Sequence, residues 1–316
     1  PEHQFHNFTR PIFRTAMQSR PRWPASLFVA YYRCSMKTRK SVRDRVNQLR
    51  MEATRKRKTR VEENKKTRVI LSDLNLDNPY ICLHNRDSEY LKYKNLSDIN
   101  DDYFRNFSFS DYEIAFQKMT NDNISFVRIG ETTSNNYLSN KYRIVDATGQ
   151  KHSNENIVQV VNGSKFIVTG NSGIAQVSRI LRKPQLFINY IPFKIEDFGA
   201  WSAQSLFIPK KLYDNKRNKF LNFREISELP YDIHTKKFFE KHDLSIIDNT
   251  QDEIFLAMLE MNQLVDQNFI QKEENNNLQN LFWEMFKDNQ YYNDLRFKIR
   301  SRVPNSFLKL NKFMVE

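Results

Sequence analysis

Residues 164–190 constrain the fold more than any other stretch, because they predict a strand, a tight turn, a helix and a second strand in direct succession. The two strands are short apolar runs at residues 166–168 and 186–188, each bounded by turn residues. Pro184 ends the helix between them. The apolar positions of that helix recur at helical spacing at Ile174, Val177, Ile180 and Leu181. Such a unit is typical of a parallel sheet covered by helices.

The turn of this unit has the sequence G-N-S-G and follows the first predicted strand at its carboxyl end. Open parallel sheets bind ligands at that edge, and the amides that begin the next helix favour anions. We expect Ser172 to cap this helix. The candidates for phosphate binding are Gly170, Asn171, Ser172 and Gly173. The alternative is a flexible connection without a ligand, because G-x-x-G is a weaker signal than a three-glycine dinucleotide motif.

Predicted strands and helices alternate from residue 69 to residue 270. All six glycines lie between Gly130 and Gly199, so backbone freedom is concentrated around the central unit. The other expected strands are residues 80–83, 124–129, 143–146, 206–209 and 244–247, and helices are expected at 154–162 and 223–229 and after capping boxes at 110–113 and 250–253. This alternation predicts an α/β fold with a Rossmann-like, doubly wound and mostly parallel sheet.

We expect three parts in the chain. Residues 1–68 form a basic N-terminal arm that is partly helical or disordered, residues 69–275 form the Rossmann-like domain, and residues 276–316 form C-terminal helices. The arm holds 19 Lys and Arg against 5 Asp and Glu, whereas the rest of the chain holds 31 against 32. A neutral body argues against a nucleic-acid-binding protein. The basic part of the arm, residues 37–68, is either a contact for an anionic membrane surface or a solvated helix or tether.

The composition places the protein among cytoplasmic proteins. Cys34 and Cys82 are the only cysteines, which excludes a disulfide framework and a cysteine metal site. The first residues, P-E-H-Q-F-H, do not resemble a signal peptide, and no apolar run has the roughly 20 residues that span a membrane. We therefore expect a cytoplasmic protein, peripheral at the inner face of a membrane if the arm binds lipid, and the missing initiator Met leaves open that the chain is a fragment.

A second polar cluster, H-N-R-D-S, follows the predicted strand at residues 80–83. Its members are His84, Asn85, Arg86, Asp87 and Ser88. A guanidinium suits a bidentate grip on phosphate oxygens, and Asp87 or His84 has the chemistry of a base. The alternative is a surface pair between Arg86 and Asp87 beside a structural histidine.

Three further residues are candidates for the same ligand. Arg128 alternates with Phe126 in a predicted strand, and Asp146 ends another. Lys210 follows a third strand and carries a charge that neutralises phosphate. The alternatives are a solvent-facing Arg128, an Asp146 that only starts a turn, and lysines at 210 and 211 that are simply exposed.

The sequence resembles a family of bacterial glycosyltransferases associated with surface polysaccharides and the cell envelope. The resemblance covers about residues 70–265 and is carried, in order, by V-I-L-S-D-L-N-L-D-N-P-Y-I-C-L-H-N-R-D-S-E-Y-L, F-V-R-I-G, K-F-I-V-T-G-N-S-G-I, R-K-P, I-N-Y-I-P and S-L-F-I-P-K-K-L. That family is similar to the nucleotide-sugar lobe of fucosyltransferase-like enzymes with two Rossmann lobes. In those enzymes an H-x-R at a strand end grips the donor pyrophosphate. The resemblance therefore implies that Arg86 binds the diphosphate and that residues 170–173 lie against the same donor.

The implied activity is transfer of a hexosyl or fucosyl group from a nucleoside diphosphate to a glycan or lipid-linked envelope acceptor. A non-catalytic module that binds nucleotide or glycan is the alternative. No D-x-D motif follows a predicted strand near the site, so we expect neither a metal nor another cofactor. The chain departs from the family in two places. Glu155 is the only carboxylate in the linker H-S-N-E-N-I-V-Q-V-V, and residues 1–68 do not resemble an acceptor-binding lobe.

Overall fold

The computed structural model describes the greater part of the chain from residue 72 onward. The described residues are 72, 74, 76, 79–86, 104–120, 123–130, 142–148, 154–191, 193, 204–229, 236–267, 276–289 and 301–316. By its internal contacts the chain divides into residues 1–62 and residues 63–316, and every described residue belongs to the second unit. The predictions for the basic arm, residues 1–68, lie outside the described residues.

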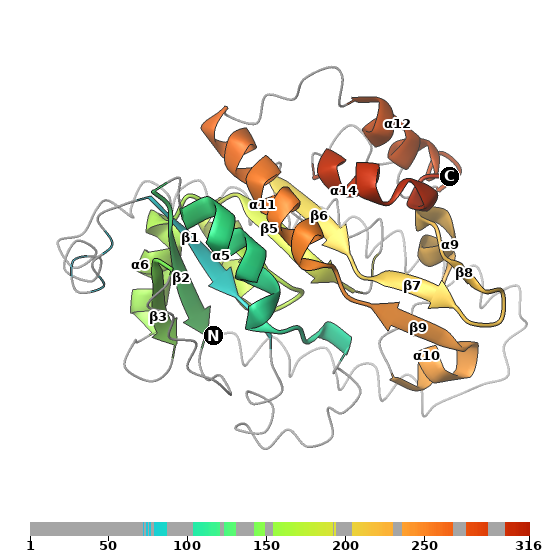
Figure 1. Ribbon diagram of the computed structural model, residues 1–316, viewed down its shortest axis with the longest axis horizontal. Coiled ribbons are helices and arrows are strands. Elements are labelled where there is room, and N and C mark those ends of the chain that lie inside the picture. The colour runs from blue at the N-terminus through green and yellow to red at the C-terminus, as the bar shows by residue number, and fades with distance from the viewer. Residues whose placement is uncertain are drawn as a thin grey trace, which may run out of the picture. The chain divides into compact units, whose positions relative to one another are not determined.

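A six-stranded parallel sheet forms the centre of the described unit (Figure 1). Its strands are β1 (Tyr80–His84), β2 (Ser125–Gly130), β3 (Ile144–Thr148), β4 (Ile167–Thr169), β5 (Gln185–Tyr190) and β6 (Ser205–Pro209). They lie in the order β3-β2-β1-β4-β5-β6, and all five neighbouring pairs are parallel. This is the strand order of the Rossmann fold, so the predicted fold class is confirmed.

Side chains alternate between the two faces of the sheet, and both faces are buried. In β1, Ile81 and Leu83 belong to one hydrophobic core, and Tyr80 and Cys82 belong to another. A strand that packs on both sides needs a continuous apolar run, which explains why β1, β4, β5 and β6 could be predicted from the sequence.

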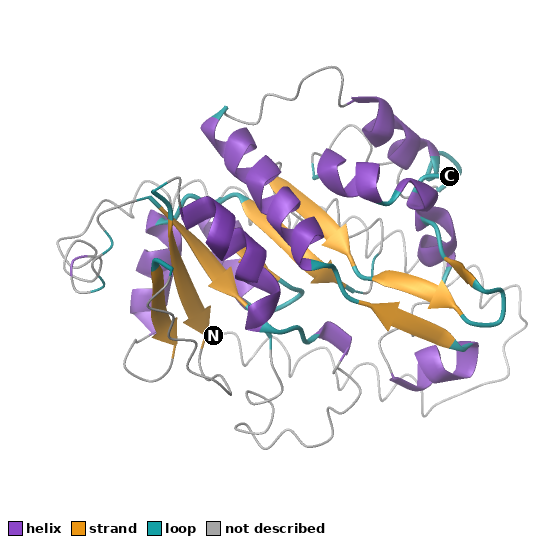
Figure 2. Cartoon of the chain, viewed as in Figure 1, coloured by secondary structure: helices purple, strands orange, loops and turns teal. Residues whose placement is uncertain are grey.

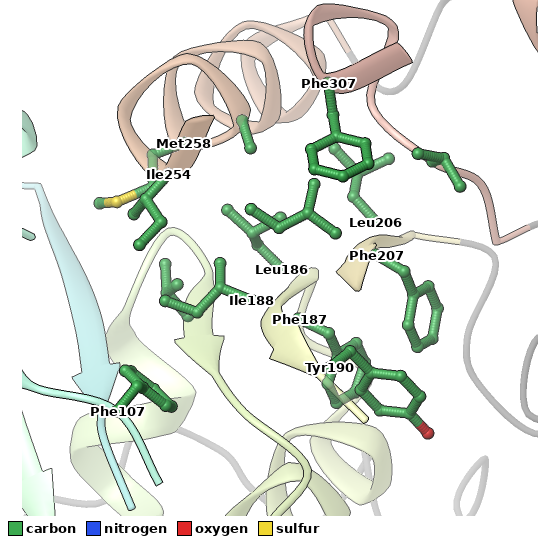
Figure 3. Close-up of a cluster of buried hydrophobic side chains, with 14 of the residues drawn as sticks. Phe107, Leu186, Phe187, Ile188, Tyr190, Leu206, Phe207, Ile254, Met258 and Phe307 are labelled. Atoms are coloured by element: carbon green, nitrogen blue, oxygen red, sulfur yellow. The ribbon is translucent and has the colours of Figure 1, made fainter. Parts of the chain in front are cut away.

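Helices cover both faces, as expected for a doubly wound sheet (Figure 2). The helices α5 (Glu113–Met119) and α11 (Gln251–Asp266) pack against each other over the face of Ile81 and Leu83. The helices α6 (Asn154–Gly163) and α7 (Ile174–Leu181) contact each other, and Val160 and Val161 of α6 and Val177 of α7 share a core with Tyr80 and Cys82. Figure 3 shows the larger core, where Ile254 and Met258 of α11 lie over Leu186 and Ile188 of β5.

A separate three-stranded antiparallel sheet follows β6 directly. It consists of β7 (Lys211–Asp214), β8 (Lys219–Phe220) and β9 (Leu244–Ile247), in the order β8-β7-β9. The strand expected at residues 244–247 is present as β9, but it pairs antiparallel with β7 and lies outside the parallel sheet. Only Lys210 separates β6 from β7, so β7 has no crossover connection of the kind that a parallel neighbour of β6 requires.

The remaining helices among the described residues are short and extend the larger core. They are η2 (Phe109–Tyr112), α9 (Phe223–Glu228), α10 (Lys236–His242), α12 (Asn276–Glu284), α14 (Asn305–Leu310) and η5 (Lys312–Met314). The C-terminal residues Phe282 and Phe307 are fully buried in that core. Within the part of the chain that the structure covers, no helix is both long and apolar enough to cross a bilayer.

Two capping boxes were expected, and one is where the sequence placed it. Thr250 accepts from the amide of Glu253, and Glu253 accepts from the amide of Thr250, at the start of α11. The box predicted at residues 110–113 lies two residues earlier instead. Ser108 is the N-cap of η2, and Asp111 completes the box.

Candidate functional site

The order of the strands reverses between β1 and β4. From β1 the chain adds β2 and β3 on one side, and after α6 it returns to add β4, β5 and β6 on the other. Connections that leave two neighbouring strands in opposite directions open a crevice at the carboxyl edge, where proteins of this topology bind nucleotides. The candidate site is therefore the carboxyl end of β1 together with the turn between β4 and α7.

The register of the two strands brings both predicted motifs to this point. His84, the last residue of β1, pairs with Thr169, the last residue of β4. Arg86 lies two residues beyond His84, and Asn171 lies two residues beyond Thr169. The H-N-R segment and the G-N-S-G turn therefore leave adjacent strands at the same level.

A hydrogen-bonded triangle links the two strand ends. The imidazole Nδ1 of His84 lies 3.2 Å from Thr169 Oγ1 and 3.3 Å from Ser172 Oγ, and the two hydroxyl oxygens are 3.0 Å apart. Each hydroxyl has a second partner within the triangle, so the three side chains fix one another.

His84 carries no charge at neutral pH in this setting. Burial lowers the pKa of His84 to about 4, and the nearby guanidinium groups of Arg86 and Arg128 act in the same direction. A neutral imidazole offers one donor and one acceptor and contributes no charge to the site.

The two glycines of the turn have different reasons to be glycine. A Cβ atom at Gly170 would lie 2.8 Å from Cε1 of Phe107, so the Phe107 ring excludes any side chain there. A Cβ atom at Gly173 would have no atom within 4 Å, and Gly173 is exposed. Packing explains Gly170, whereas Gly173 faces open space in which a ligand has room.

The start of α7 differs from the expected anion site in two details. Gly173 is the N-cap, and Ser172 does not cap the helix because its hydroxyl binds Thr169 and His84 instead. The amides of Ala175 and Gln176 already donate to the carbonyls of Ser172 and Gly173. The row of available amides is therefore shorter than expected, while the positive end of the helix dipole still faces this edge.

Asn85 and Arg86 are held by a segment that comes from elsewhere in the chain. The backbone amide of Phe107 donates to the carbonyl of Arg86 at 3.2 Å, and Asn85 Nδ2 lies 3.5 Å from the carbonyl of Phe107. Asn85 is buried, and its Oδ1 has no hydrogen-bond partner among the described residues. Arg86 is half-buried.

Arg128 and Asp146 bind each other beside this point. Arg128 is 2% exposed, which rules out the solvent-facing alternative, and its guanidinium lies 3.6 Å from Asp146 and 4.3 Å from the centre of the Phe109 ring. Asp146 also accepts from the amide and the hydroxyl of Thr148. Arg128 lies on the sheet face of Phe109, whereas His84 lies on the opposite face with Thr169 and Ser172.

Lys210 and Lys211 are both buried, which rules out the alternative that they are simply exposed. Lys210 Nζ donates to the carbonyl of Asn106 at 2.9 Å and lies 2.6 Å from Asp248. Lys211 Nζ lies 2.7 Å from Glu253 on α11. Both ammonium groups have protein partners, and of the two only Lys210 lies at the carboxyl edge of the parallel sheet, directly after β6.

Two candidate residues, Asp87 and Ser88, lie outside the described residues. Within the described ranges, no group of three or more His, Cys, Asp or Glu side chains is arranged to hold a metal ion. Sequence reasoning missed Thr169 and Phe107. Thr169 had a usable signal, because it is the last residue before the turn, whereas nothing local marks Phe107.

No protein-family model matches the chain, and no curated protein matches it. Solved structures similar to it include the E. coli ADP-heptose LPS heptosyltransferase II, with 12% identity, 66% of this chain and 54% of that chain covered, and a TM-score of 0.38. The E. coli heptosyltransferase WaaC with ADP has 12% identity, 54% and 46% coverage and a TM-score of 0.31. The same enzyme with ADP-2-deoxy-2-fluoro heptose has 14% identity, 55% and 47% coverage and a TM-score of 0.32. The chain spans about half the length of these structures.

Proposed function

We propose that this protein binds a nucleoside-diphosphate sugar and transfers the sugar to a glycan or lipid-linked acceptor of the bacterial envelope. The observation that carries the proposal is the meeting of the H-N-R segment and the G-N-S-G turn where the strand order reverses. The sequence resemblance to bacterial glycosyltransferases supports the same reading, since its motifs include both segments.

The proposed chemistry is stabilisation of the leaving diphosphate. Negative charge builds up on that group as the bond to the sugar breaks, and fixed positive groups lower the barrier by binding the developing charge. Arg86 supplies a planar guanidinium that suits two phosphate oxygens, and the start of α7 supplies the positive end of a helix dipole. Gly173 allows a phosphate to approach the backbone closely, because the space beside its Cα is open.

His84 has a different part in this proposal. With a pKa of about 4 the imidazole is a weak base at neutral pH, where general bases work best with a pKa near the working pH. We therefore assign to His84 the fixing of the turn through Ser172 and Thr169. If the reaction inverts the anomeric configuration of the sugar, we assign to Asp87 the role of the base that activates the acceptor.

The proposal includes no metal. Arg86 and the helix end supply the positive charge that a metal supplies in other transferases. The proposed reaction also requires a lobe that binds the acceptor, and residues 1–68 do not resemble such a lobe. A partner or a further segment provides it, and the basic arm holds the protein at an anionic membrane surface on the cytoplasmic side.

A thermal-shift screen tests the donor site. The panel contains UDP, GDP and TDP sugars and an ADP sugar, the last because the similar WaaC structures contain ADP or an ADP sugar. We expect one nucleotide class to raise the melting temperature of the wild type and to lose that effect in Arg86→Ala. Arg179→Ala is the control, because Arg179 lies in the last turn of α7, at the end of that helix away from the site.

Slow hydrolysis of the same nucleotide sugar without acceptor separates an enzyme from a non-catalytic binding module. We expect release of nucleoside diphosphate by the wild type and not by Arg86→Ala. A wild type that binds the nucleotide sugar and never releases diphosphate, with or without candidate acceptors, supports the binding module instead. If no nucleotide sugar of the panel raises the melting temperature of the wild type, the proposal is contradicted.

A further inference from the structure

The segment of residues 104–112, which we call the edge segment, lies across the carboxyl edge of the parallel sheet. At one end of its path it meets β1, where the amide of Phe107 donates to the carbonyl of Arg86 and the carbonyl of Phe107 faces Asn85 Nδ2. Farther along, Ser110 accepts from Gln251 Nε2 at the start of α11. The edge segment therefore connects the end of β1 with the start of α11.

Phe107 touches both halves of the proposed donor site. Its backbone binds Arg86, and its ring lies against Gly170 so closely that a Cβ there would be 2.8 Å from Cε1. Figure 3 shows the Phe107 side chain beside the end of β1. A shift of Phe107 therefore moves the backbone of the H-N-R segment and the packing of the G-N-S-G turn together.

Lys210 holds the residue next to Phe107. Its side chain is 3% exposed, and its ammonium donates to the carbonyl of Asn106 at 2.9 Å while pairing with Asp248 at 2.6 Å. Burial lowers the pKa of Lys210, and the carboxylates of Asp248 and Asp111 oppose that effect. A buried ammonium is retained only with such partners, and here one of them is a backbone carbonyl of the edge segment.

We propose that Lys210 is a positioning residue for the donor site, which acts by fixing Asn106 and Phe107 and thereby the backbone of Arg86. The proposal rests on the proposed function and gives Lys210 a role other than direct phosphate binding. Two of the three donors of its ammonium serve the edge segment and Asp248. The alignment of Arg86 is then set by a residue more than 100 positions away in the sequence.

The test replaces Lys210 by Met, which keeps the length of the side chain and removes the ammonium. Asp248 is half exposed, so it remains hydrated in this variant and the fold is retained. Lys165→Met is the matched control, because Lys165 also pairs with a half-exposed aspartate, Asp266, at 2.8 Å. Lys165 precedes β4, at the opposite edge of the sheet.

Two quantities are measured in the wild type and in each variant. The first is the rate of hydrogen exchange of the Phe107 amide, and the second is the Kd for the nucleoside diphosphate found in the screen. We expect Lys210→Met to speed the exchange and to weaken binding, each by about tenfold, as coupled neighbours do. Lys165→Met leaves both quantities unchanged, and Lys210→Arg restores most of the binding because it also donates to the carbonyl of Asn106.

A double variant separates positioning from direct contact. If Lys210 acts through Arg86, then Lys210→Met adds little to the loss already caused by Arg86→Ala. Weaker binding with unchanged exchange of the Phe107 amide, or fully additive losses, means direct contact with the ligand and overturns the proposal. Unchanged exchange and unchanged Kd in Lys210→Met overturn it as well. If the wild type binds no nucleoside diphosphate, the proposed function fails, and the exchange rate alone still decides whether Lys210 holds the edge segment.

Discussion

His84 Nδ1 lies 3.3 Å from Ser172 Oγ and thereby joins the end of β1 to the turn before α7. The two residues are 88 positions apart in the sequence, and each belongs to one of the two segments that form the candidate site. A contact that connects both halves of the site determines how far apart they lie. Its loss is therefore expected to affect stability and ligand binding together.

The charge state of His84 predicts a pH-dependent stability. Its pKa in the folded protein is about 4, below the unfolded value of about 6.5, so the unfolded chain binds the proton more readily between those values. The stabilisation is complete above about pH 6.5 and is lost as the pH falls toward 4, with a slope of at most about 1.4 kcal/mol per pH unit. Urea unfolding of the wild type and His84→Gln, repeated across this pH range, measures the difference. Equal pH dependence of the two proteins contradicts the assignment.

The two glycines of the turn are expected to respond differently to alanine. Gly170→Ala lowers the free energy of unfolding by about 1–3 kcal/mol, because the added methyl group meets the Phe107 ring. Gly173→Ala changes stability by less than about 1 kcal/mol, since its methyl group enters open space. Chemical denaturation measures both values, and titration with the nucleoside diphosphate then shows weaker binding for Gly173→Ala. Similar stability losses in the two variants contradict this reading of the turn.

The pair of Lys211 and Glu253 is expected to stabilise the contact between β7 and α11. Glu253 is 5% exposed at its side chain and accepts from both Lys211 and Asn311. Lys211→Met leaves a buried carboxylate without its main partner and lowers the free energy of unfolding by about 3–5 kcal/mol. Lys211→Met combined with Glu253→Gln recovers part of that loss, because the amide removes the uncompensated charge and its single oxygen still accepts from the amide of Thr250. Urea unfolding checks both variants, and a double variant no more stable than the single one contradicts the explanation.

The central unit of the fold could be predicted because its signals are local. The apolar run before the G-N-S-G turn lies in β4, and the apolar run after the helix lies in β5. Pro184 follows the end of α7 as expected. Thr250 and Glu253 formed their capping box for the same reason, since both partners lie within one turn. Ser108 and Asp111 took the place of the other predicted box because several serines and acids in that stretch satisfy the same pattern.

The site could be predicted only in part. The general rule for parallel sheets predicts that ligand-binding residues lie at the carboxyl ends of strands. In the structure, the register of His84 with Thr169 brings the two motifs together. Strand order itself is a property of tertiary packing, which no local pattern encodes. The contacts of Lys210 with Asn106 and of Phe107 with Gly170 join residues far apart in sequence, so spacing arguments could not find them.

The most direct test of the account is a calorimetric titration of the wild type and Arg86→Ala with the nucleoside diphosphate selected by the screen. We predict saturable one-to-one binding to the wild type and at least about tenfold weaker binding to Arg86→Ala, because hydrogen bonds to a charged group contribute about 1.5–3 kcal/mol. Equal affinity of the two proteins, or no binding to the wild type, contradicts the claim that the ends of β1 and β4 form a diphosphate site.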